Sequence, residues 1–493
     1  MAATINVDGT SCTLIDAVTA ANNDAPAGGC TAGSGADTLV LPAGSTHTLT
    51  AVNNYSYSYD STGLPRVTSA ITIAGNGSTI TRDPGAPQFR ILEVAENGHL
   101  TLQEITVSGG ANTSLYGRGG GLQNSGILTL TNSTVSGNST GQYGNGGGVS
   151  NTGTLTLTNS TVSGNSASSG GGVAGSGVLT LTNSTVSGNS ASSGGGVHNN
   201  GTLTLTNSTV SGNSAANRGG GVSNITGILT LVQTVVSGNT ASGQGPEVDN
   251  YPGGSYAAAT VIANNLNLFG HDGVAGVTGF TPGPTDLVPS APLGAILNPT
   301  LGDNGGLTRT HALVAGSPAT DAVAAASCAT ASDQRGVLRP QDSDADTVAD
   351  CDIGAFELAL PAVETVAADP NPQSRCTRSR CDILIKCNVD QALGTPCTNQ
   401  IRFFVRERDV RLSEASTNQG ATEAASTTAL RRIRFAFGVA NVPPGETANV
   451  RLRLTKRAKQ IVRTSTRRRL RGVMEIRNSV GTVSSTRIRI RLK

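Results

Sequence analysis

The stretch that decides the fold reads Gly119-Gly-Gly-Leu-Gln-Asn-Ser-Gly-Ile-Leu-Thr-Leu-Thr-Asn-Ser-Thr-Val-Ser-Gly-Asn138. Its pattern returns along the chain, with Gly-Gly-Gly triplets beginning at positions 119, 146, 170, 194 and 219. The intervals between these triplets are 27, 24, 24 and 25 residues. A strand-rich repeat of this length is typical of solenoid proteins. We therefore predict a stack of similar coils, each about 24 residues long.

Each repeat contains a segment in which apolar and polar residues alternate, such as Leu179-Thr-Leu-Thr182. Alternation with period two places Leu on the inner face of a strand and Thr on the outer face. Val173 and Val186 supply further inward positions, and Gly, Asn and Ser mark turns between three short strands. The pattern predicts an all-β chain whose first part is a parallel β-helix, and the family resemblance described below implies that it is right-handed.

Two series of asparagines recur at fixed places in the repeat. Stacked coils place equivalent residues above one another at about 4.8 Å, so both series are predicted to form ladders of amide hydrogen bonds. The first ladder is Asn132, Asn159, Asn183 and Asn207, and the second is Asn138, Asn165, Asn189, Asn213 and Asn239.

The net charge of +2 is the sum of two oppositely charged parts. Before Pro361 the chain has 8 Arg, no Lys and 22 acidic residues, and after it 26 basic and 10 acidic residues, which gives −14 and +16. Because the open ends of a solenoid invite pairing with other chains, we expect covers at both ends. We predict an N-terminal cap over 1–36, the β-helix over 37–297, a C-terminal cap over 298–361, and a basic domain over 362–493. In this domain, alternating segments such as Val450-Arg-Leu-Arg-Leu454 and Ile488-Arg-Ile-Arg-Leu492 predict a small antiparallel β-sandwich, and residues 438–493 resemble Ig-like modules at the C-termini of secreted bacterial proteins.

The cysteines lie outside the repeats, and none has the CxxC spacing of a zinc site. We interpret them as disulfide-bonded residues of an oxidising compartment, and the pairing of the last four stays open among three options. They are Cys12, Cys30, Cys328, Cys351, Cys376, Cys381, Cys387 and Cys397. We therefore expect a secreted protein whose signal peptide was removed before the numbering begins.

Two segments resemble a known group of proteins. Cys12-Thr-Leu-Ile-Asp-Ala17, with Asp37-Thr-Leu-Val-Leu-Pro42 after it, resembles the CSLREA motif at the start of secreted bacterial right-handed β-helix proteins, from which Thr13, Ile15 and Asp16 depart. Asn304-Gly-Gly-Leu-Thr-Arg-Thr-His311 and Asp352-Ile-Gly-Ala-Phe-Glu357 are similar to the choice-of-anchor Q module that closes such helices. The resemblance covers about residues 1–360 and implies a pectin-lyase-like fold at the cell surface.

Parallel β-helices often cleave acidic polysaccharides, but this repeat region lacks the residues for that chemistry. No Asp or Glu occurs between Glu104 and Glu247, so paired carboxylates cannot lie on these coils. We interpret His198 as an exposed turn residue, and any active site would have to lie near Glu93, Glu96, Glu104, Asp249 and Asp272. A polysaccharide lyase or hydrolase therefore stays an alternative.

The outer faces of the repeat strands carry rows of threonines, which stop at Val232. Such rows suit an ice-binding or glycan-binding solenoid, although Thr is also simply a favourable strand residue. The rows are Thr129 and Thr131, Thr156 and Thr158, Thr180 and Thr182, and Thr204 and Thr206. The uncharged coils also suit a subunit of a self-assembling fibre.

One calcium site is a candidate. Asp342, Asp344, Asp346 and Asp350 have a spacing that can place carboxylates around Ca²⁺, with Val348 offering its carbonyl. Thr347 stands where calcium loops carry Gly, and Ile353 where they carry Glu, so an acidic surface loop is the alternative. In the same region we interpret Asp333, Arg335, Asp352 and Glu357 as a charge cluster that seals the last coil.

The C-terminal region is rich in arginine, with 22 Arg and 4 Lys after Pro361. Arginine favours bidentate contact with phosphate, sulfate or carboxylate. The candidate anion-binding residues are Arg451, Arg453, Arg467, Arg468, Arg469, Arg471, Arg487, Arg489 and Arg491. We expect an anionic cell-surface glycan, lipopolysaccharide or extracellular nucleic acid as the partner, with a solvated basic face as the alternative. The protein is thus predicted to be a secreted, non-catalytic, adhesive or structural β-helix tethered through this domain.

Overall fold

The computed structural model describes residues 2–55, 60–251, 258–343 and 348–359 in full. Of the rest, it describes the backbone of the strands from β33 (Arg375–Cys376) to β39 (Val483–Leu492). The chain divides into two units, Met1–Leu360 and Pro361–Lys493. Each unit is described by itself below.

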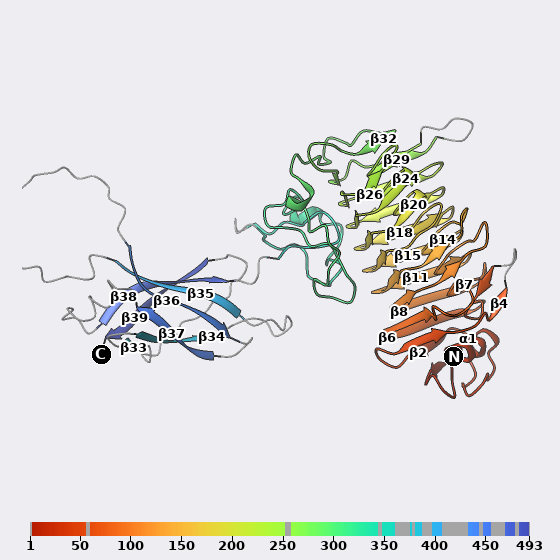
Figure 1. Ribbon diagram of the computed structural model, residues 1–493, viewed down its shortest axis with the longest axis horizontal. Coiled ribbons are helices and arrows are strands. Elements are labelled where there is room, and N and C mark those ends of the chain that lie inside the picture. The colour runs from red at the N-terminus through yellow and green to blue at the C-terminus, as the bar shows by residue number, and fades with distance from the viewer. Residues whose placement is uncertain are drawn as a thin grey trace, which may run out of the picture. The chain divides into compact units, whose positions relative to one another are not determined.

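The first unit is a parallel β-solenoid, in which successive coils stack along one axis (Figure 1). In one coil the chain runs through β10 (Leu122–Asn124), β11 (Ile127–Thr131) and β12 (Thr134–Ser136). Each strand pairs in parallel with its equivalent in the next coil, as Leu122 does with Val149. The prediction of a parallel β-helix is therefore confirmed for this part of the chain.

The strands form long parallel sheets. An 8-stranded sheet consists of β7 (Leu92–Val94), β10, β14 (Val149–Asn151), β17 (Val173–Gly175), β21 (Val197–Asn199), β25 (Val222–Asn224), β29 (Val248–Asn250) and β32 (Val277–Thr278). The Leu-Thr strands of the second row are β2 (Asp37–Val40), β11, β15 (Thr154–Thr158), β18 (Val178–Thr182), β22 (Thr202–Thr206), β26 (Ile228–Val232) and β30 (Thr260–Ile262).

A third row follows the second around a tight corner. It comprises β3 (Thr46–Leu49), β12, β16 (Thr161–Ser163), β19 (Thr185–Ser187), β23 (Thr209–Ser211), β27 (Val235–Val236) and β31 (Leu268–Phe269). Two longer strands, β6 (Ala70–Arg82) and β8 (His99–Ser108), run through the corner and join both rows. Short strands complete some coils: β9 (Ala111–Asn112), β13 (Ser139–Thr140), β20 (Ser190–Ser193), β24 (Ser214–Arg218) and β28 (Thr240–Ala241).

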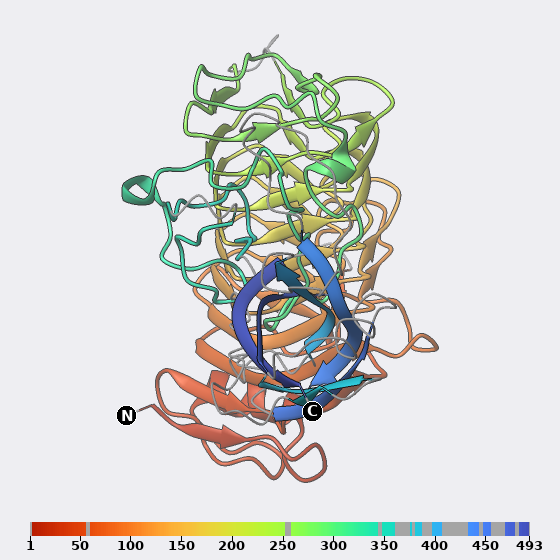
Figure 2. The same ribbon diagram turned by 90° about the vertical axis from the view of Figure 1, so that its left-hand side faces the viewer.

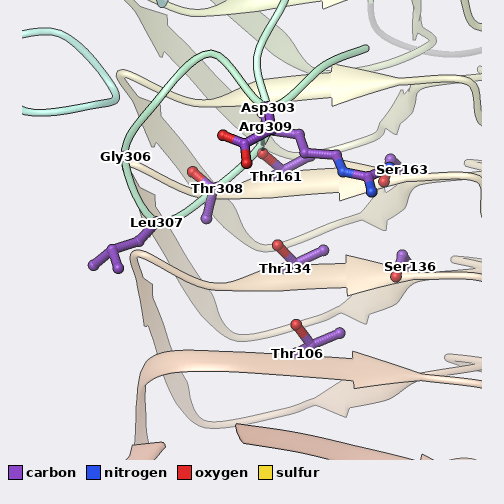
Figure 3. A pocket seen from close by; sticks show the side chains of 10 residues that line it. All are labelled: Thr106, Thr134, Ser136, Thr161, Ser163, Asp303, Gly306, Leu307, Thr308 and Arg309. Carbon is purple, nitrogen blue, oxygen red and sulfur yellow. Dashed lines mark hydrogen bonds between the residues drawn. The ribbon is translucent and has the colours of Figure 1, made fainter. Parts of the chain in front are cut away.

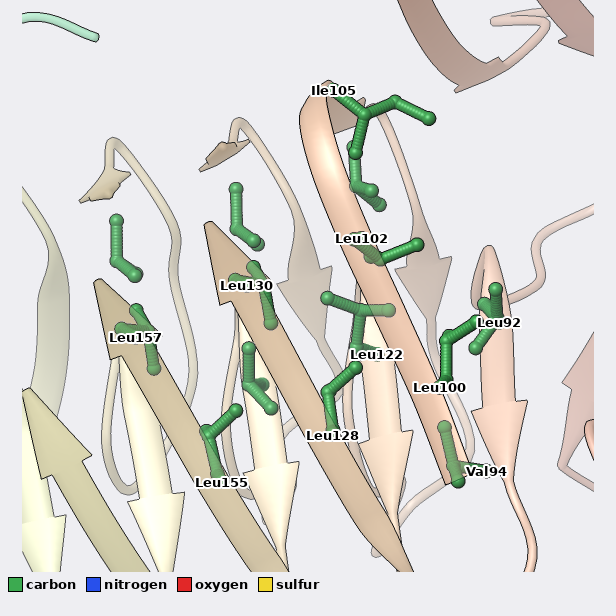
Figure 4. Close-up of a cluster of buried hydrophobic side chains, with 14 of the residues drawn as sticks. Leu92, Val94, Leu100, Leu102, Ile105, Leu122, Leu128, Leu130, Leu155 and Leu157 are labelled. Atoms are coloured by element: carbon green, nitrogen blue, oxygen red, sulfur yellow. The ribbon is translucent and has the colours of Figure 1, made fainter. Parts of the chain in front are cut away.

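The interior of the solenoid is a column of stacked aliphatic side chains (Figure 4). Leu128 and Leu130 lie above Leu155 and Leu157 in register, and all four are buried. Full burial of a leucine side chain contributes about 1.5–3 kcal/mol. Because every coil repeats this contribution, the column supplies the main apolar stabilisation of the unit.

The triple glycines let the backbones of successive coils approach closely. A Cβ atom on Gly171 would lie 2.4 Å from the carbonyl oxygen of Ser190 and 2.5 Å from that of Gly195. Gly170 adopts a left-handed conformation with φ +64°. A side chain at Gly171 would therefore push neighbouring coils apart, and one at Gly170 would be strained and would meet the carbonyl of Val173 in its own coil.

Asn138, Asn165, Asn189, Asn213 and Asn239 form a continuous buried ladder. The backbone N–H and side-chain amide of Asn165 both donate to Oδ1 of Asn189, each at 3.0 Å. The ladder ends at Glu247, whose carboxyl group accepts hydrogen bonds from Asn239 and from the backbone of Gly238. A further series that the repeat did not reveal links Asn199, Asn224 and Asn250.

The other asparagine series does not form the predicted ladder. Asn132, Asn159, Asn183 and Asn207 occupy the corner between the second and third rows with φ between 43° and 51°. In the described coils no hydrogen bond joins these four side chains to one another; instead Asn183 donates to the carbonyl of Ser332. The physical reason is that Asn recurs here because it tolerates the left-handed backbone conformation that the corner requires.

The N-terminal region covers the first coil. β1 (Thr4–Asn6) pairs with β2, and α1 (Leu14–Asn23) packs Leu14, Val18 and Ala21 onto the end of the core. Cys12 and Cys30 form a disulfide beside this helix. Among the described residues of the first unit, α1 is the single α-helix, and the rest of the regular structure is mainly strands. The N-cap of the helix is Thr13.

The segment from Asn298 to Leu358, which we call the strap, lies along the flank of the solenoid (Figure 2). It contains η2 (Ala325–Ser327) and the disulfide between Cys328 and Cys351, and η1 (Leu293–Ala295) precedes it. Its apolar residues, including Leu313 and Phe356, pack with Val235 and Leu268 of the last coils. The region predicted as a C-terminal cap therefore contacts the side of several coils.

The second unit contains seven strands whose backbones pair in a closed order, β33-β34-β37-β36-β35-β38-β39. The remaining strands are β34 (Arg380–Lys386), β35 (Cys397–Arg406), β36 (Arg432–Val442), β37 (Thr447–Leu454) and β38 (Arg469–Asn478). The Ig-like sandwich stays a prediction. Among the residues that the structure describes, no helix has the length and apolarity needed to cross a membrane.

We predict that Asn189→Ala destabilises the solenoid by at least about 3 kcal/mol, because it removes buried hydrogen bonds to Asn165, Asn213 and Val162 and leaves the backbone N–H of Asn165 without its acceptor. Urea unfolding followed by circular dichroism measures the change. Asn200→Ala, at an exposed position, is the matched control and should be nearly neutral. Equal stability of the two variants would contradict a stabilising role for the ladder.

Candidate functional site

A polar row runs along the outer face of the 8-stranded sheet. It is formed by the middle residues of successive strands, which point away from the core because their neighbours, such as Leu122 and Val149, point into it. In register order the row is Glu93, Gln123, Ser150, Ala174, His198, Ser223, Asp249 and Thr278.

Most of this row is buried although it faces outward. Gln123 is 5% exposed, and Ser223 and Asp249 are 0% exposed. Among the residues that the structure describes, the buried atoms Gln123 Oε1, His198 Nδ1, Ser223 Oγ and both carboxyl oxygens of Asp249 have no hydrogen-bond partner. Because an unsatisfied buried polar atom costs about 1–3 kcal/mol, such a series marks a place where water or a ligand binds.

A groove of about 200 Å³ opens above the centre of the row. Ser150 and His198 lie on its floor, Arg118 and Asn145 on one wall, and Thr152 and Asn200 among the turn residues that line it. We call this the axial groove. It presents amides, hydroxyls, an imidazole and one guanidinium.

His198 lies at the middle of β21 rather than in an exposed turn, so that interpretation was wrong. The imidazole is shielded because the residues on both sides of the strand form the groove around it. Burial lowers the pKa of His198 to about 4, so the ring is neutral at pH 7. A neutral imidazole offers one hydrogen-bond donor and one acceptor to the groove.

The ends of the polar row carry compensated charges. Asp249 faces Arg218 at 3.8 Å, and burial raises the pKa of Asp249 while Arg218 opposes the shift. At the other end Glu93 pairs with Arg66 at 3.0 Å, and Arg90 pairs with Asp60. Glu96 and Asp272 are exposed elsewhere and Glu104 is at the corner, so these acids are not brought together.

A second groove lies at the edge of the strap (Figure 3). Its volume is about 490 Å³, and hydroxyls of the third row face Asp303 and Arg309 across it. The row residues are Thr106, Thr134, Thr161, Ser136 and Ser163. Thr185, Ser187 and Thr209 continue the same rows but are buried beside the strap.

The strap binds the corner residues of successive coils. Thr308 Oγ1 donates to the carbonyl of Asn159 at 2.8 Å, and Gln233 Nε2 donates to the carbonyl of Ser327 at 2.6 Å. Gln334 is buried between the two layers and donates to Thr161 and Thr308, both at 2.9 Å. Thr185 Oγ1 in turn donates to Gln334 Oε1 at 2.6 Å.

An ionic cluster holds the strap together. Arg335 pairs with Asp333 at 2.7 Å and lies over the ring of Phe356, while Arg339 pairs with Glu357 at 2.7 Å. Burial raises the pKa of Asp352 to about 7, with Glu357 adding to the shift. Arg339 also belongs to this ionic cluster through its ion pair with Glu357, although the sequence pattern did not predict it as a member.

The predicted calcium loop is described only in part. Asp344 and Asp346 lie outside the described residues, and Asp350 accepts a hydrogen bond from the backbone N–H of Ala325 at 2.9 Å. Within the described ranges, no group of three or more His, Cys, Asp or Glu residues is arranged to hold a metal ion.

The candidate anion-binding arginines lie on paired strands of the second unit. Arg469 is opposite Arg491 and Arg471 is opposite Arg489, while Arg487 is two residues from Arg489 on the same strand. Arg451 and Arg453 lie on β37, opposite Asp382 and Arg380, and Arg467 and Arg468 lie outside the described residues. Cys376 is opposite Cys381, Cys397 begins β35, and Cys387 lies outside the described residues.

Comparison with protein-family models, curated proteins and solved structures gives no match for this chain. The physical description of the sites therefore carries the functional argument.

We predict that acidification destabilises the solenoid partly through His198. The folded pKa of about 4 lies below the ordinary 6.5, so the unfolded state takes up a proton first. The contribution of the neutral His198 ring to the free energy of unfolding is complete above pH 6.5 and is lost as the pH falls toward 4. His198→Asn should reduce that loss by up to about 3 kcal/mol, as measured by unfolding at pH 7 and pH 4.5. Identical pH profiles for both proteins would contradict the burial of this ring.

We predict that Gln334→Ala loosens the strap by about 2–4 kcal/mol, because three side-chain hydrogen bonds to Thr161, Thr185 and Thr308 are lost. Hydrogen exchange of residues 327–338 should rise, while exchange in the strands β11 and β15 stays unchanged. Gln142→Ala, at an exposed site, is the control. Unchanged protection of the strap would show that Gln334 does not anchor it.

Proposed function

We propose that the chain is a secreted, non-catalytic protein of the cell surface or matrix. In this proposal the basic second unit tethers the solenoid to an anionic polymer, and the role is adhesive or structural. The observation that carries it is the alignment of Arg469, Arg471, Arg489 and Arg491 across β38 and β39. Directly opposed residues share one face of a sheet, so like charges accumulate there at a cost that an anionic ligand offsets.

Two further observations support an extracellular location. The disulfides between Cys12 and Cys30 and between Cys328 and Cys351 belong to an oxidising compartment. The resemblance of the first 360 residues to CSLREA-containing and choice-of-anchor Q proteins of bacteria, with a right-handed pectin-lyase-like helix, also favours a surface role. A similar Ig-like module at the C-terminus fits a tether.

The chemistry of the basic strands restricts the partner. Arginine outnumbers lysine in the second unit by 22 to 4, which favours planar oxyanions that accept two hydrogen bonds. Phosphate of lipopolysaccharide or extracellular nucleic acid and sulfate or carboxylate of a cell-surface glycan all fit. We expect affinity to depend steeply on salt concentration, because charge supplies most of the binding energy.

The test removes three arginines of β39, two of which belong to the aligned set. In the full-length protein, Arg487→Gln, Arg489→Gln and Arg491→Gln together should weaken binding to heparin and to DNA and reduce the salt slope of log K by up to about 3 for DNA. The matched control removes the same charge from the sequence between β37 and β38, through Lys456→Gln, Arg457→Gln and Lys459→Gln. We expect a clearly smaller effect from the control.

Two results would overturn the proposal. Failure of the wild-type protein to bind any anionic polymer at low salt would remove the tether. Equal losses in the two triple variants would show that only total charge matters, and not the alignment of the strands. Circular dichroism of all three proteins checks that the second unit stays folded.

A further inference from the structure

We infer that the axial groove binds an uncharged glycan chain, at a site separate from the basic unit. The groove is floored by Ser150, Ala174 and His198 of the polar row, and its lining comes from successive coils of the stack. The inference rests on the polar side chains that these coils present to the groove, on an exposed aromatic pair beside one wall, and on the small charge of the groove.

The residues that line the groove are arranged for a repeating ligand. Thr152, Ser176 and Asn200 directly follow β14, β17 and β21 and are exposed, so three successive coils each present a polar side chain to the groove. Equivalent positions repeat at about 4.8 Å along the stack. A chain of sugars offers hydroxyls at comparable intervals and can satisfy one coil after another.

The aromatic pair lies on the loops that form the wall. Tyr116 and Tyr143 stack on each other with their centroids 5.6 Å apart, and they are 70% and 50% exposed. They stand two residues before the wall residues Arg118 and Asn145, and Leu115 beside them is 54% exposed. Exposed apolar clusters rimmed by polar residues mark binding sites, and aromatic faces suit the apolar face of a sugar ring.

The charges favour an uncharged ligand over an anionic one. The coils between Glu104 and Glu247 carry two arginines and no acidic residue. Arg218 is already paired with Asp249 and lies over the ring of Tyr251 at 5.1 Å, which leaves Arg118 alone at the wall. Neutral amides and hydroxyls therefore make up most of the surface that would contact the ligand.

The test measures binding of soluble neutral polysaccharides, a glucan, a mannan, a galactan and a xylan, to the full-length protein by calorimetry. Measurements at about 1 M salt shorten the screening length to about 3 Å and suppress binding through the basic unit. We expect at least one of the four polymers to bind under these conditions. The triple variant of Arg487, Arg489 and Arg491 should bind it as the wild type does.

Variants of the groove locate the site. Tyr116→Ala with Tyr143→Ala should weaken binding about tenfold, and His198→Ala should weaken it several-fold. Tyr55→Ala is the control, because Tyr55 is 73% exposed but lies on β4 (Asn54–Tyr55), which pairs with β5 (Ser61–Thr62), away from the groove. Thermal unfolding confirms that each variant is folded.

Three outcomes would overturn the inference. No binding of any of the four polymers would remove it, as would equal weakening by Tyr55→Ala and the groove variants. Self-association that is abolished by the tyrosine variants would assign the aromatic pair to contact with a second copy instead. If the protein failed to bind anionic polymers but still bound a neutral polysaccharide, only the proposed tether would be contradicted.

Discussion

The constant spacing between coils is the constraint on which the structure depends. In the three rows of the solenoid each strand pairs in parallel with its equivalent one coil away, so each position must tolerate an equivalent position directly above and below it. The triple glycines meet this requirement where the backbones of successive coils approach most closely. In the core, the stacked side chains of Leu128, Leu155 and Leu179 meet it by packing on one another. The ladder through Asn165 and Asn189 satisfies it where polar groups are buried.

The same constraint explains the placement of charge. A charged residue repeated in every coil would face its own copy at the spacing between strands, and the coils between Glu104 and Glu247 accordingly carry two arginines and no acidic residue. In the irregular coils and the strap, buried charges are compensated individually, as Arg66 and Arg90 compensate Glu93, and Arg339 compensates Glu357. The repeated surface is left to hydroxyls and amides, which can act together without mutual repulsion.

Much of this organisation was predictable from the sequence, because the repeat carries one short pattern of residues into every coil of the solenoid. The alternation in Leu179-Thr-Leu-Thr182 predicted both the strand and its inward face, and the ladder through Asn189 followed from its period. The corner asparagines were misassigned because backbone conformation, which decides where an amide points, is not visible in spacing. His198 was misassigned because residues that shield it come from other coils.

The strap has a consequence for the evolution of the repeat number. Arrays of similar repeats gain and lose units readily, and most of the coils here would accept a new neighbour. However, the strap docks at Asn159, Asn183 and Gln233 through Thr308, Ser332 and Ser327. An added coil between these anchors would separate them by about 4.8 Å, beyond the reach of a hydrogen bond. The strap therefore fixes the number of coils between Asn159 and Gln233.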